Sequence, residues 1–182
     1  VYVTNGYLSK EALNKIAPYL DAANIDLKSF SAQFYRDIVK AKLEEVLNSI
    51  NEFYNAGIHI ELTTLLIPGK NDSVAELKNI ANFIAGIDKD IPWHISRFTP
   101  QYKMLAVKTT SHEKLKQAYE IGKEAGLSFV YIGNINDIQL QSTYCPKCNE
   151  LLIERDWGYV SVKNLIKGKC GNCGFKIKGV WK

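Results

Sequence analysis

The chain has 182 residues, a formal net charge of +4 and a hydrophobic fraction of 46%. A chain of this length buries the core of one ordinary domain and leaves room for a small additional module. The charge is too small to indicate nucleic-acid binding by itself. No apolar stretch reaches the roughly 18 residues that a membrane-spanning helix needs, so we expect no segment that spans a membrane.

Apolar stripes at helical spacing alternate with short β-prone runs through residue 132. The predicted strands cover residues 1–4, 22–27, 58–67, 93–98 and 128–132, and the predicted helices cover residues 10–20, 43–54, 77–84 and 115–125. Serines precede three of the helices and glycines end three of them, at Ser9, Ser73, Ser111, Gly57, Gly86 and Gly126. Glu76 completes a capping box with Ser73. This alternation predicts a parallel sheet with right-handed crossovers.

The predicted fold class is α/β, with residues 1–134 forming part of a TIM-like (β/α) barrel, because each helix is apolar along one stripe only. No G-x-G-x-x-G sequence follows a strand, which disfavours a dinucleotide-binding sheet. Five predicted strands are few for a closed barrel, and the chain begins within a strand without an initiator methionine. We therefore expect a fragment of a longer protein, whose N-terminal barrel units lie upstream. Residues 135–182 are predicted to form a second, smaller unit.

Four cysteines, all within the last 38 residues, form two close pairs. Two C-x-x-C sequences are separated by 21 residues and contain Cys145, Cys148, Cys170 and Cys173. Two residues between thiolates let one tight turn direct both sulfurs at the same ion, and two such turns complete a tetrahedral shell. We predict a zinc ribbon with structural Zn²⁺, although four sulfurs also accept iron, and the alternative is reactive dithiols or disulfides. Paired cysteines in an otherwise cysteine-free chain favour a reducing, cytoplasmic location.

Polar residues gather where the predicted strands end or face a barrel interior. They are Thr4, Asn5, Asn24, Asp26, Lys28, Thr63 and His94. In parallel barrels the active site is built at the C-terminal ends of the strands, so these side chains are expected to share one pocket. Simpler interpretations exist: Thr4 and Asn5 can form a turn, and His94 can be a satisfied core histidine. Asp26 can pair with Lys28, but a carboxylate facing a barrel interior needs some cation or donor, which makes it the strongest candidate.

Several short motifs occur in a recognisable order. They are Thr4-Asn5-Gly6, Asp26-Leu27-Lys28, residues 66–72 (LIPGKND), residues 93–98 (WHISRF), residues 102–104 (YKM) and the two terminal cysteine pairs. This ordered set resembles the radical S-adenosylmethionine (radical SAM) family, in the branch of the pyruvate formate-lyase activating enzymes. The later motifs are most similar to the radical enzymes of the AmmeMemoRadiSam system. The resemblance covers nearly the whole chain, which would be the C-terminal portion of such an enzyme.

The resemblance implies a [4Fe–4S] cluster, reduced by a donor such as ferredoxin or flavodoxin, that cleaves S-adenosylmethionine to a 5′-deoxyadenosyl radical. In the activating enzymes this radical takes a hydrogen from a glycyl residue of a protein substrate. The cofactors supply the difficult chemistry and the barrel positions them. By resemblance, the residues that line or adjoin the S-adenosylmethionine pocket are Thr4, Asn5, Asn24, Asp26, Lys28, Thr63 and His94.

Parts of the family pattern are absent from this sequence. The cluster motif C-x-x-x-C-x-x-C does not occur, nor does the Gly-Gly-Glu segment that binds the cofactor's amino group. Both belong to units expected upstream of Val1, and Val3 stands where activating enzymes can carry an aspartate. We therefore expect this chain alone to be inactive, and the sequence identifies no catalytic residue in it.

Two other functions stay open. The cysteine module could bind nucleic acid, since lysines such as Lys147, Lys163 and Lys167 make it basic. Few aromatic residues interleave with these lysines, which argues against base stacking and makes nucleic acid the weaker choice. The barrel could instead belong to an aldolase that uses Lys28 as a Schiff-base amine, with Asp26 beside it. A C-x-x-x-C-x-x-C motif upstream would decide for the radical SAM hypothesis.

Overall fold

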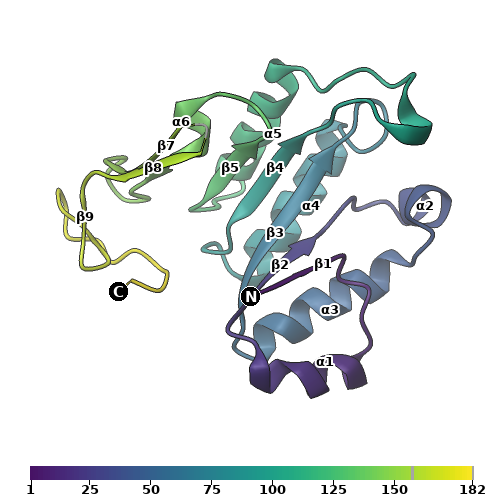
Figure 1. Cartoon of the computed structure of the whole chain (residues 1–182), viewed down its shortest axis with the longest axis horizontal. Coiled ribbons are helices and arrows are strands. Elements are labelled where there is room, and N and C mark those ends of the chain that lie inside the picture. The colour runs from purple at the N-terminus through teal and green to yellow at the C-terminus, as the bar shows by residue number, and fades with distance from the viewer. Residues whose placement is uncertain (157, 182) are drawn as a thin grey trace.

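A computed structural model describes residues 1–156 and 158–181. Its main sheet has five parallel strands in the spatial order of the chain: β1 (Tyr2–Thr4), β2 (Ala22–Asp26), β3 (His59–Leu66), β4 (Trp93–Arg97) and β5 (Val130–Gly133). The longer helices cover one face of this sheet: α3 (Leu43–Asn55), α4 (Val74–Ile87) and α5 (His112–Glu124) (Figure 1). Helix α1 (Lys10–Ile16) lies against α3. The predicted α/β fold with a parallel sheet is confirmed.

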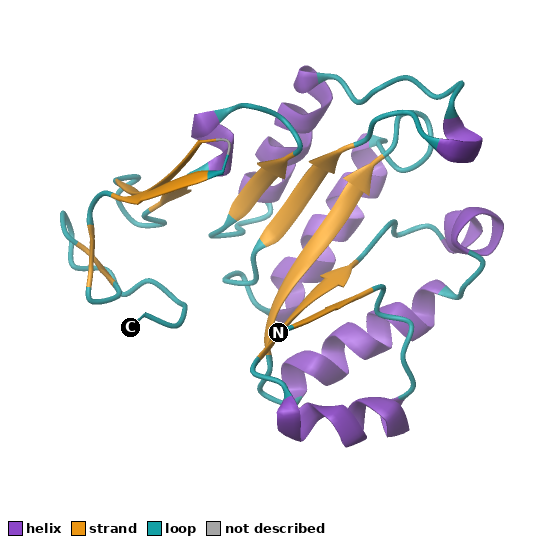
Figure 2. Ribbon diagram, viewed as in Figure 1, coloured by secondary structure: helices purple, strands orange, loops and turns teal. Residues whose placement is uncertain are grey.

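The C-terminal module extends from α6 onward and lies beside β5 (Figure 2). It contains α6 (Ile138–Gln141), an antiparallel sheet of β6 (Thr143–Tyr144), β7 (Leu151–Asp156) and β8 (Tyr159–Val162), and a two-stranded ribbon of β9 (Leu165–Ile166) and β10 (Lys169–Cys170). Short strands joined by tight turns are what a module of this size can form around a small core.

The sequence-based boundaries fail in three places, each for a local reason. The helix predicted over residues 10–20 is α only to Ile16, because Pro18 converts the rest into the 3₁₀ turn η1 (Ala17–Tyr19). Residues 32–39, for which no element was predicted, form the short helix α2 (Ala32–Phe34) and the π-helix η2 (Tyr35–Val39). Gly86 lies inside α4 and does not end it. Another short turn, η3 (Tyr102–Met104), follows β4.

The capping box at α4 is made only in part. The Ser73 hydroxyl accepts a hydrogen bond from the Glu76 backbone N–H at 3.2 Å, as predicted. The Glu76 carboxylate does not accept the hydrogen bond from the Ser73 backbone N–H that would complete the box. It accepts from the Ser29 hydroxyl and, at 2.5 Å, from the Phe30 backbone N–H. A predicted local bond is thus replaced by one that fixes the loop after β2 to α4.

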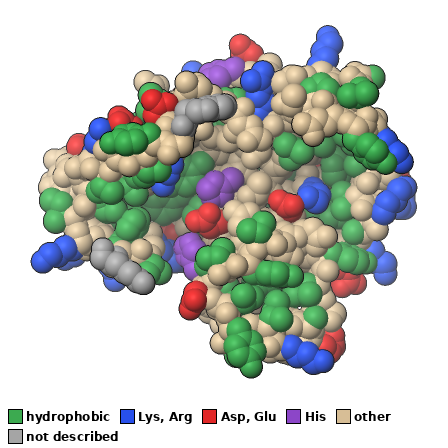
Figure 3. All heavy atoms as spheres, viewed as in Figure 1, with side chains coloured by type: hydrophobic (Ala, Val, Ile, Leu, Met, Phe, Trp, Pro, Cys, Tyr) green, Lys and Arg blue, Asp and Glu red, His purple; other side chains and the backbone are tan. Residues whose placement is uncertain are grey.

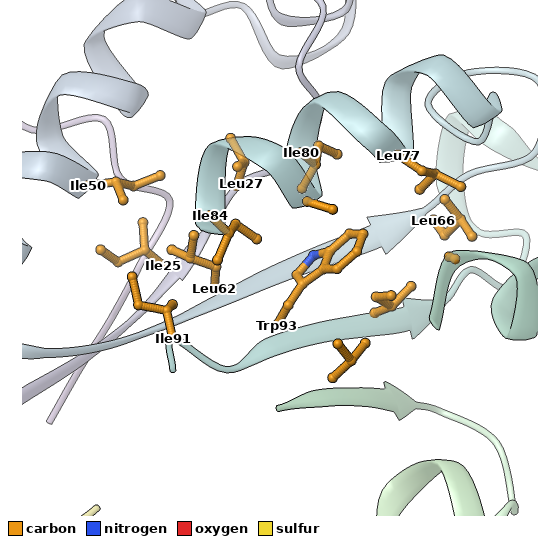
Figure 4. Packing of buried hydrophobic residues seen from close by; sticks show 14 of the residues in the cluster. Ile25, Leu27, Ile50, Leu62, Leu66, Leu77, Ile80, Ile84, Ile91 and Trp93 are labelled. Carbon is orange, nitrogen blue, oxygen red and sulfur yellow. The ribbon is translucent and has the colours of Figure 1, made fainter. Parts of the chain in front are cut away.

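The main core lies between the sheet and its helices. Alternate residues of the central strands, including Ile25, Leu62 and Trp93, are fully buried against α3 and α4 (Figure 4). The Trp93 indole N–H donates to the Thr64 hydroxyl at 3.0 Å, and that hydroxyl donates to the Leu27 carbonyl at 2.8 Å. Because these buried polar groups are all paired, the core includes them at little cost.

The opposite side of the sheet, here called the open face, is not covered by α3, α4 or α5. Parallel register places Asp26 beside Thr63 and Thr63 beside His94, so the alternate residues of neighbouring strands share this face. These side chains are only half-buried. Within the part of the chain that the structure describes, no helix combines the length and the apolar composition needed to cross a membrane.

Two helical glycines give a matched test of how closely α5 packs on the sheet. A Cβ at Gly122 would lie 2.9 Å from the Val130 side chain and 3.1 Å from the Trp93 ring, whereas a Cβ at Gly86 would meet nothing within 4 Å. We expect Gly122→Ala to lower the free energy of unfolding by about 1–3 kcal/mol through overpacking. Gly86→Ala should raise it by about 0.5–1 kcal/mol, because alanine restricts the unfolded chain. Urea titration of both variants measures this, and a stabilising Gly122→Ala would contradict the close packing.

Candidate functional site

The four cysteine sulfurs converge on one point of the C-terminal module. The Sγ atoms of Cys145, Cys148, Cys170 and Cys173 all lie within 4.8 Å of one another. Cys145 and Cys173 are 3.6 Å apart at sulfur, as are Cys148 and Cys170. An ion about 2.3 Å from each sulfur would separate tetrahedral neighbours by about 3.8 Å. The donor set and its spacing therefore fit a single metal ion.

The two C-x-x-C turns have the same backbone hydrogen bonds. In the first, the Cys145 N–H donates to the Glu150 carbonyl at 2.8 Å and the Asn149 N–H donates to the Cys145 carbonyl at 2.9 Å. In the second, the N–H of Cys170 donates to Phe175 at 2.9 Å and that of Gly174 donates to Cys170 at 2.8 Å. Asn149 and Gly174 occupy the equivalent position with positive φ, 59° and 70°. Local turn chemistry thus directs each pair of sulfurs inward.

The four neighbouring thiols shift one another's pKa values. A hydrogen bond to the Glu150 backbone, together with the neighbouring thiols, lowers the pKa of Cys148 to about 7. At Cys173 the Phe175 backbone acts in the same direction, but three neighbouring sulfurs raise its pKa to about 12. Four thiolates this close repel one another, so all four ionise together only when a cation neutralises them.

A second group of polar side chains lies on the open face, at the end of β2. The Lys28 ammonium is 2.7 Å from the Asp26 carboxylate, and both side chains are about one-third exposed, at 36%. The Thr63 hydroxyl donates to the Asn24 side-chain oxygen at 2.9 Å. The structure therefore brings together four of the residues singled out in the sequence. Asp26 has the lysine partner that the simpler interpretation expected.

Hydrogen bonds with Tyr35 and Asn71 fix the backbone of Lys28. The Lys28 N–H donates to the hydroxyl of Tyr35 in the π-helix at 3.2 Å, and burial raises the pKa of Tyr35 to about 12. The buried Asn71 side chain, from the 66–72 motif, donates to the Lys28 carbonyl at 2.6 Å and to the Leu65 carbonyl at 2.9 Å. Asn71 thus ties the ends of β2 and β3 together. π-Helical turns are frequent at functional sites.

Thr4 and Asn5 do not join this group. Register pairs Val3 with Asn24 and Thr4 with Ile25, so Thr4 follows the helix-covered side of the sheet. The Thr4 hydroxyl accepts from the Gly6 N–H at 3.2 Å, and the Asn5 side chain accepts from the Tyr7 N–H at 3.0 Å. Both make the local turn that was the simpler interpretation. The expectation that the Thr4 hydroxyl converges on Asp26 is wrong, because a strand's alternation decides the face of each residue.

His94 lies on the open face and binds Glu61, a residue that the sequence analysis missed. The Glu61 carboxylate is 2.8 Å from His94 Nε2 and 3.7 Å from His59 Nε2. The hydrogen bond with His94 lowers the pKa of Glu61, which is therefore ionised. The sequence did contain one indication of Glu61: it alternates with His59 and Thr63 along one strand, so all three lie on the same face. The pairing with His94 across to β4 was not available from local sequence.

The C-terminal module is joined to the main sheet by several contacts. Phe129, from the segment before β5, belongs to the small apolar cluster that surrounds Cys145 and Cys170. The Arg155 guanidinium lies over the Tyr131 ring, with 5.1 Å from its central carbon to the ring centre, and donates to the Thr143 hydroxyl at 2.7 Å. The Lys178 ammonium forms an ion pair with Asp88, next to the end of α4. The module is therefore fixed beside β5.

No protein-family model matches the chain. An uncharacterized protein of Methanocaldococcus jannaschii is 41% identical over 180 residues, covering 97% of this chain and 53% of that protein. The GTP 3',8-cyclase of Limosilactobacillus fermentum is 28% identical over 180 residues, covering 86% of this chain and 52% of the enzyme. The chain thus spans about half the length of the curated relatives it matches.

Solved structures share its fold. A domain of a pyruvate-formate lyase-activating enzyme from Bacteroides vulgatus superposes with a TM-score of 0.62 at 25% identity, covering 73% of this chain and 80% of that one. The fold of this chain is therefore similar to that of an activating-enzyme domain. A radical SAM methyltransferase from Sphaerobacter thermophilus has a TM-score of 0.58 at 16% identity, covering 71% of this chain and 38% of that one, and so supports the fold alone. The chain thus shares its fold with these two structures and is similar in sequence to a GTP 3',8-cyclase.

Gly171, inside the second C-x-x-C turn, gives a test of how the metal site is held. A Cβ at this position would overlap the side-chain oxygen of Asn164, whose amide donates to Glu150 at 3.1 Å. We expect Gly171→Ala to displace Asn164, loosen the turn and increase the metal lost to a chelator by about tenfold, equivalent to ~1.4 kcal/mol of strain. The double variant Gly171→Ala, Asn164→Ala removes the obstacle and should recover most of the metal. Equal loss from single and double variants would contradict this account.

Proposed function

We propose that this chain is the C-terminal part of a radical SAM enzyme of the kind typified by the pyruvate formate-lyase activating enzymes. Residues 1–134 would be part of a partial (β/α) barrel that lacks its N-terminal units, and residues 135–182 a zinc ribbon. The observation that carries this proposal is the group of Asn24, Asp26, Lys28 and Thr63 on the open face of a sheet whose fold is similar to that of an activating-enzyme domain. In a parallel α/β fold, ligands bind at the carboxyl ends of strands, where Asp26 and Lys28 lie.

The side chains of this group suit a zwitterionic, cationic cofactor such as S-adenosylmethionine. Asp26 supplies a carboxylate that attracts positive charge, and Lys28 supplies an ammonium that can bind a carboxylate. The hydrogen bond between Thr63 and Asn24 fixes the neighbouring polar pair, so less freedom is lost when a ligand binds. When bound together with a reduced [4Fe–4S] cluster, S-adenosylmethionine would supply a 5′-deoxyadenosyl radical.

The cluster itself does not fit this chain. All four cysteines belong to the C-terminal module, where their sulfurs form a closed shell around one point. A closed shell of four thiolates leaves no open position for a cofactor. The cluster ligands would come from the rest of the longer protein, and this chain alone should be inactive. An electron donor such as ferredoxin or flavodoxin, a protein substrate with a glycyl residue and a cytoplasmic location remain part of the proposal.

The two alternative functions have less support. An aldolase would need Lys28 as a free amine near a carbonyl carbon, whereas the Lys28 ammonium is 2.7 Å from Asp26. A nucleic-acid-binding ribbon would present lysines with aromatic residues between them. Tyr159 and Phe175 are exposed, but Trp181 donates its indole N–H to the Ile177 carbonyl at 3.0 Å and packs on Gly168. Trp157 lies outside the described residues, and the described aromatic residues do not alternate with the lysines as in single-strand binders.

Asp26 tests the cofactor site in a full-length protein that contains this chain. Removing the carboxylate should weaken S-adenosylmethionine binding by about tenfold or more, since charged hydrogen bonds contribute ~1.5–3 kcal/mol. We expect this for both Asp26→Ala and Asp26→Asn, with the fold and the metal retained. Calorimetric titration measures the affinity and thermal melts measure stability.

Asp37→Asn is the matched control, because Asp37 is an exposed carboxylate whose ion-pair partner among the described residues is the adjacent Arg36. It should leave the affinity unchanged. If Asp26→Ala lowers the melting temperature but leaves the affinity intact, Asp26 is only a structural partner of Lys28 and the proposed cofactor site is wrong.

The metal of the ribbon can be identified directly. We expect about one tightly bound zinc per chain, because four thiolates around one point suit Zn²⁺. Elemental analysis of the purified chain, with an assay for acid-labile sulfide, distinguishes zinc from iron. Several irons per chain together with sulfide would show that these cysteines hold a cluster.

A further inference from the structure

A cleft separates the open face of the main sheet from the C-terminal module. Its volume is about 630 Å³, within the range of sites for small organic ligands. One wall comes from β3, β4 and β5, and the other from β7, β8 and the C-terminal segment. Figure 3 shows histidine and acidic side chains gathered in the hollow between these parts. Asp26, Lys28, Asn24 and Thr63 do not line it, so the cleft is distinct from the proposed cofactor site.

Glu61 is the principal polar group on the sheet side of the cleft. One carboxylate oxygen is 2.8 Å from His94, while the other has only a long contact of 3.7 Å, with His59. A carboxylate offers about four acceptor positions, so Glu61 keeps capacity for further donors. Its side chain is 36% exposed, which leaves it accessible from the cleft.

The charges around the cleft favour a cationic ligand. Asp90 is a second lining carboxylate, and it accepts from the Ser128 hydroxyl at 2.6 Å. Among the described residues, neither Glu61 nor Asp90 has a lysine or arginine within ion-pair distance. The lining Lys178 is neutralised by Asp88. Among the described lining residues Arg155 is the remaining lysine or arginine, so the carboxylates exceed the unpaired lysines and arginines by one, and His59 and His94 both contact Glu61.

The walls of the cleft are aromatic and well fixed. The Tyr131 ring is stacked on His94, with centres 5.3 Å apart, and its hydroxyl is 2.9 Å from that of Thr143. Arg155 lies over the same ring and bonds the Gln141 carbonyl at 3.2 Å. Trp181 adds a second aromatic surface, 40% exposed. Fixed aromatic walls bind a flat apolar group with little loss of side-chain entropy.

We propose that this cleft is a binding site for a small organic cation, in which an amine, amidine or guanidine is carried on a flat apolar group. Glu61 binds the cationic group, and His94 and His59 hold its carboxylate in place. Tyr131 and Trp181 contact the flat apolar group through their rings. The proposal does not depend on S-adenosylmethionine or on a cluster, so it stands or falls separately from the proposed function.

Benzamidine, benzamide and benzoate are matched probes, since they share one flat ring and differ in charge. Binding to the chain is followed by NMR of the histidine ring resonances, which requires no variant. We expect benzamidine to bind with a dissociation constant on the order of 1 mM, as suits a fragment of this size, and to shift His94 and His59. His112 is the internal control, because it pairs with Asp137 outside the cleft. Benzamide should bind at least tenfold more weakly and benzoate not at all.

Glu61→Gln should reduce benzamidine affinity at least tenfold, since it removes a charged hydrogen-bond acceptor. Glu154→Gln, in β7 and paired with Lys163, does not alter the cleft and should bind benzamidine as the unmodified chain does. Thermal melts confirm that both variants fold. Preferential binding of benzoate would show that Arg155 dominates and would overturn the proposal. Equal binding of all three probes, or no shift at His94 and His59, would overturn it as well.

Discussion

Trp93 lies at the centre of the main sheet, fully buried, and its indole N–H donates to Thr64. Thr64 in turn donates to the Leu27 carbonyl, so one chain of hydrogen bonds links β4, β3 and the end of β2. A buried donor that lost its partner would cost about 1–3 kcal/mol, so this network fixes the register of the three strands. If one strand shifted its register by one residue, its buried side chains would move to the open face and its polar side chains to the core. The polar open face therefore depends on the pairing made inside the core.

The open face holds two polar regions with different partners. Asp26 and Lys28 neutralise each other at the carboxyl end of β2. Glu61 lies further back along β3 and is held by histidines from two strands. The first region stands where ligands of parallel α/β folds bind, whereas the second faces the C-terminal module. One face of the sheet thus offers two chemically distinct surfaces.

The C-terminal module shapes the second of these surfaces. Tyr131 connects the sheet to the module. Its ring is stacked on His94, and its hydroxyl and the Arg155 guanidinium both hydrogen-bond the Thr143 hydroxyl. Phe129 packs into the module's own small core, next to two of the four cysteines. A metal ion there would stabilise that core, since metal binding contributes directly to the folding of small modules. Phe129 therefore belongs both to the lining of the cleft and to the apolar cluster around the cysteines.

The sequence alone determined what depends on near neighbours. The serine N-caps, the two C-x-x-C turns and the shared face of Asn24 and Asp26 follow from spacings of a few residues, and the strands alternate with helices as predicted. Only the tertiary structure decided that Thr4 leaves the open face, that Glu76 binds the loop after β2, and that Glu61 meets His94. These contacts depend on strand register and on how helices pack across the sheet. Such long-range pairings arise from burial summed over many residues, which no local pattern encodes.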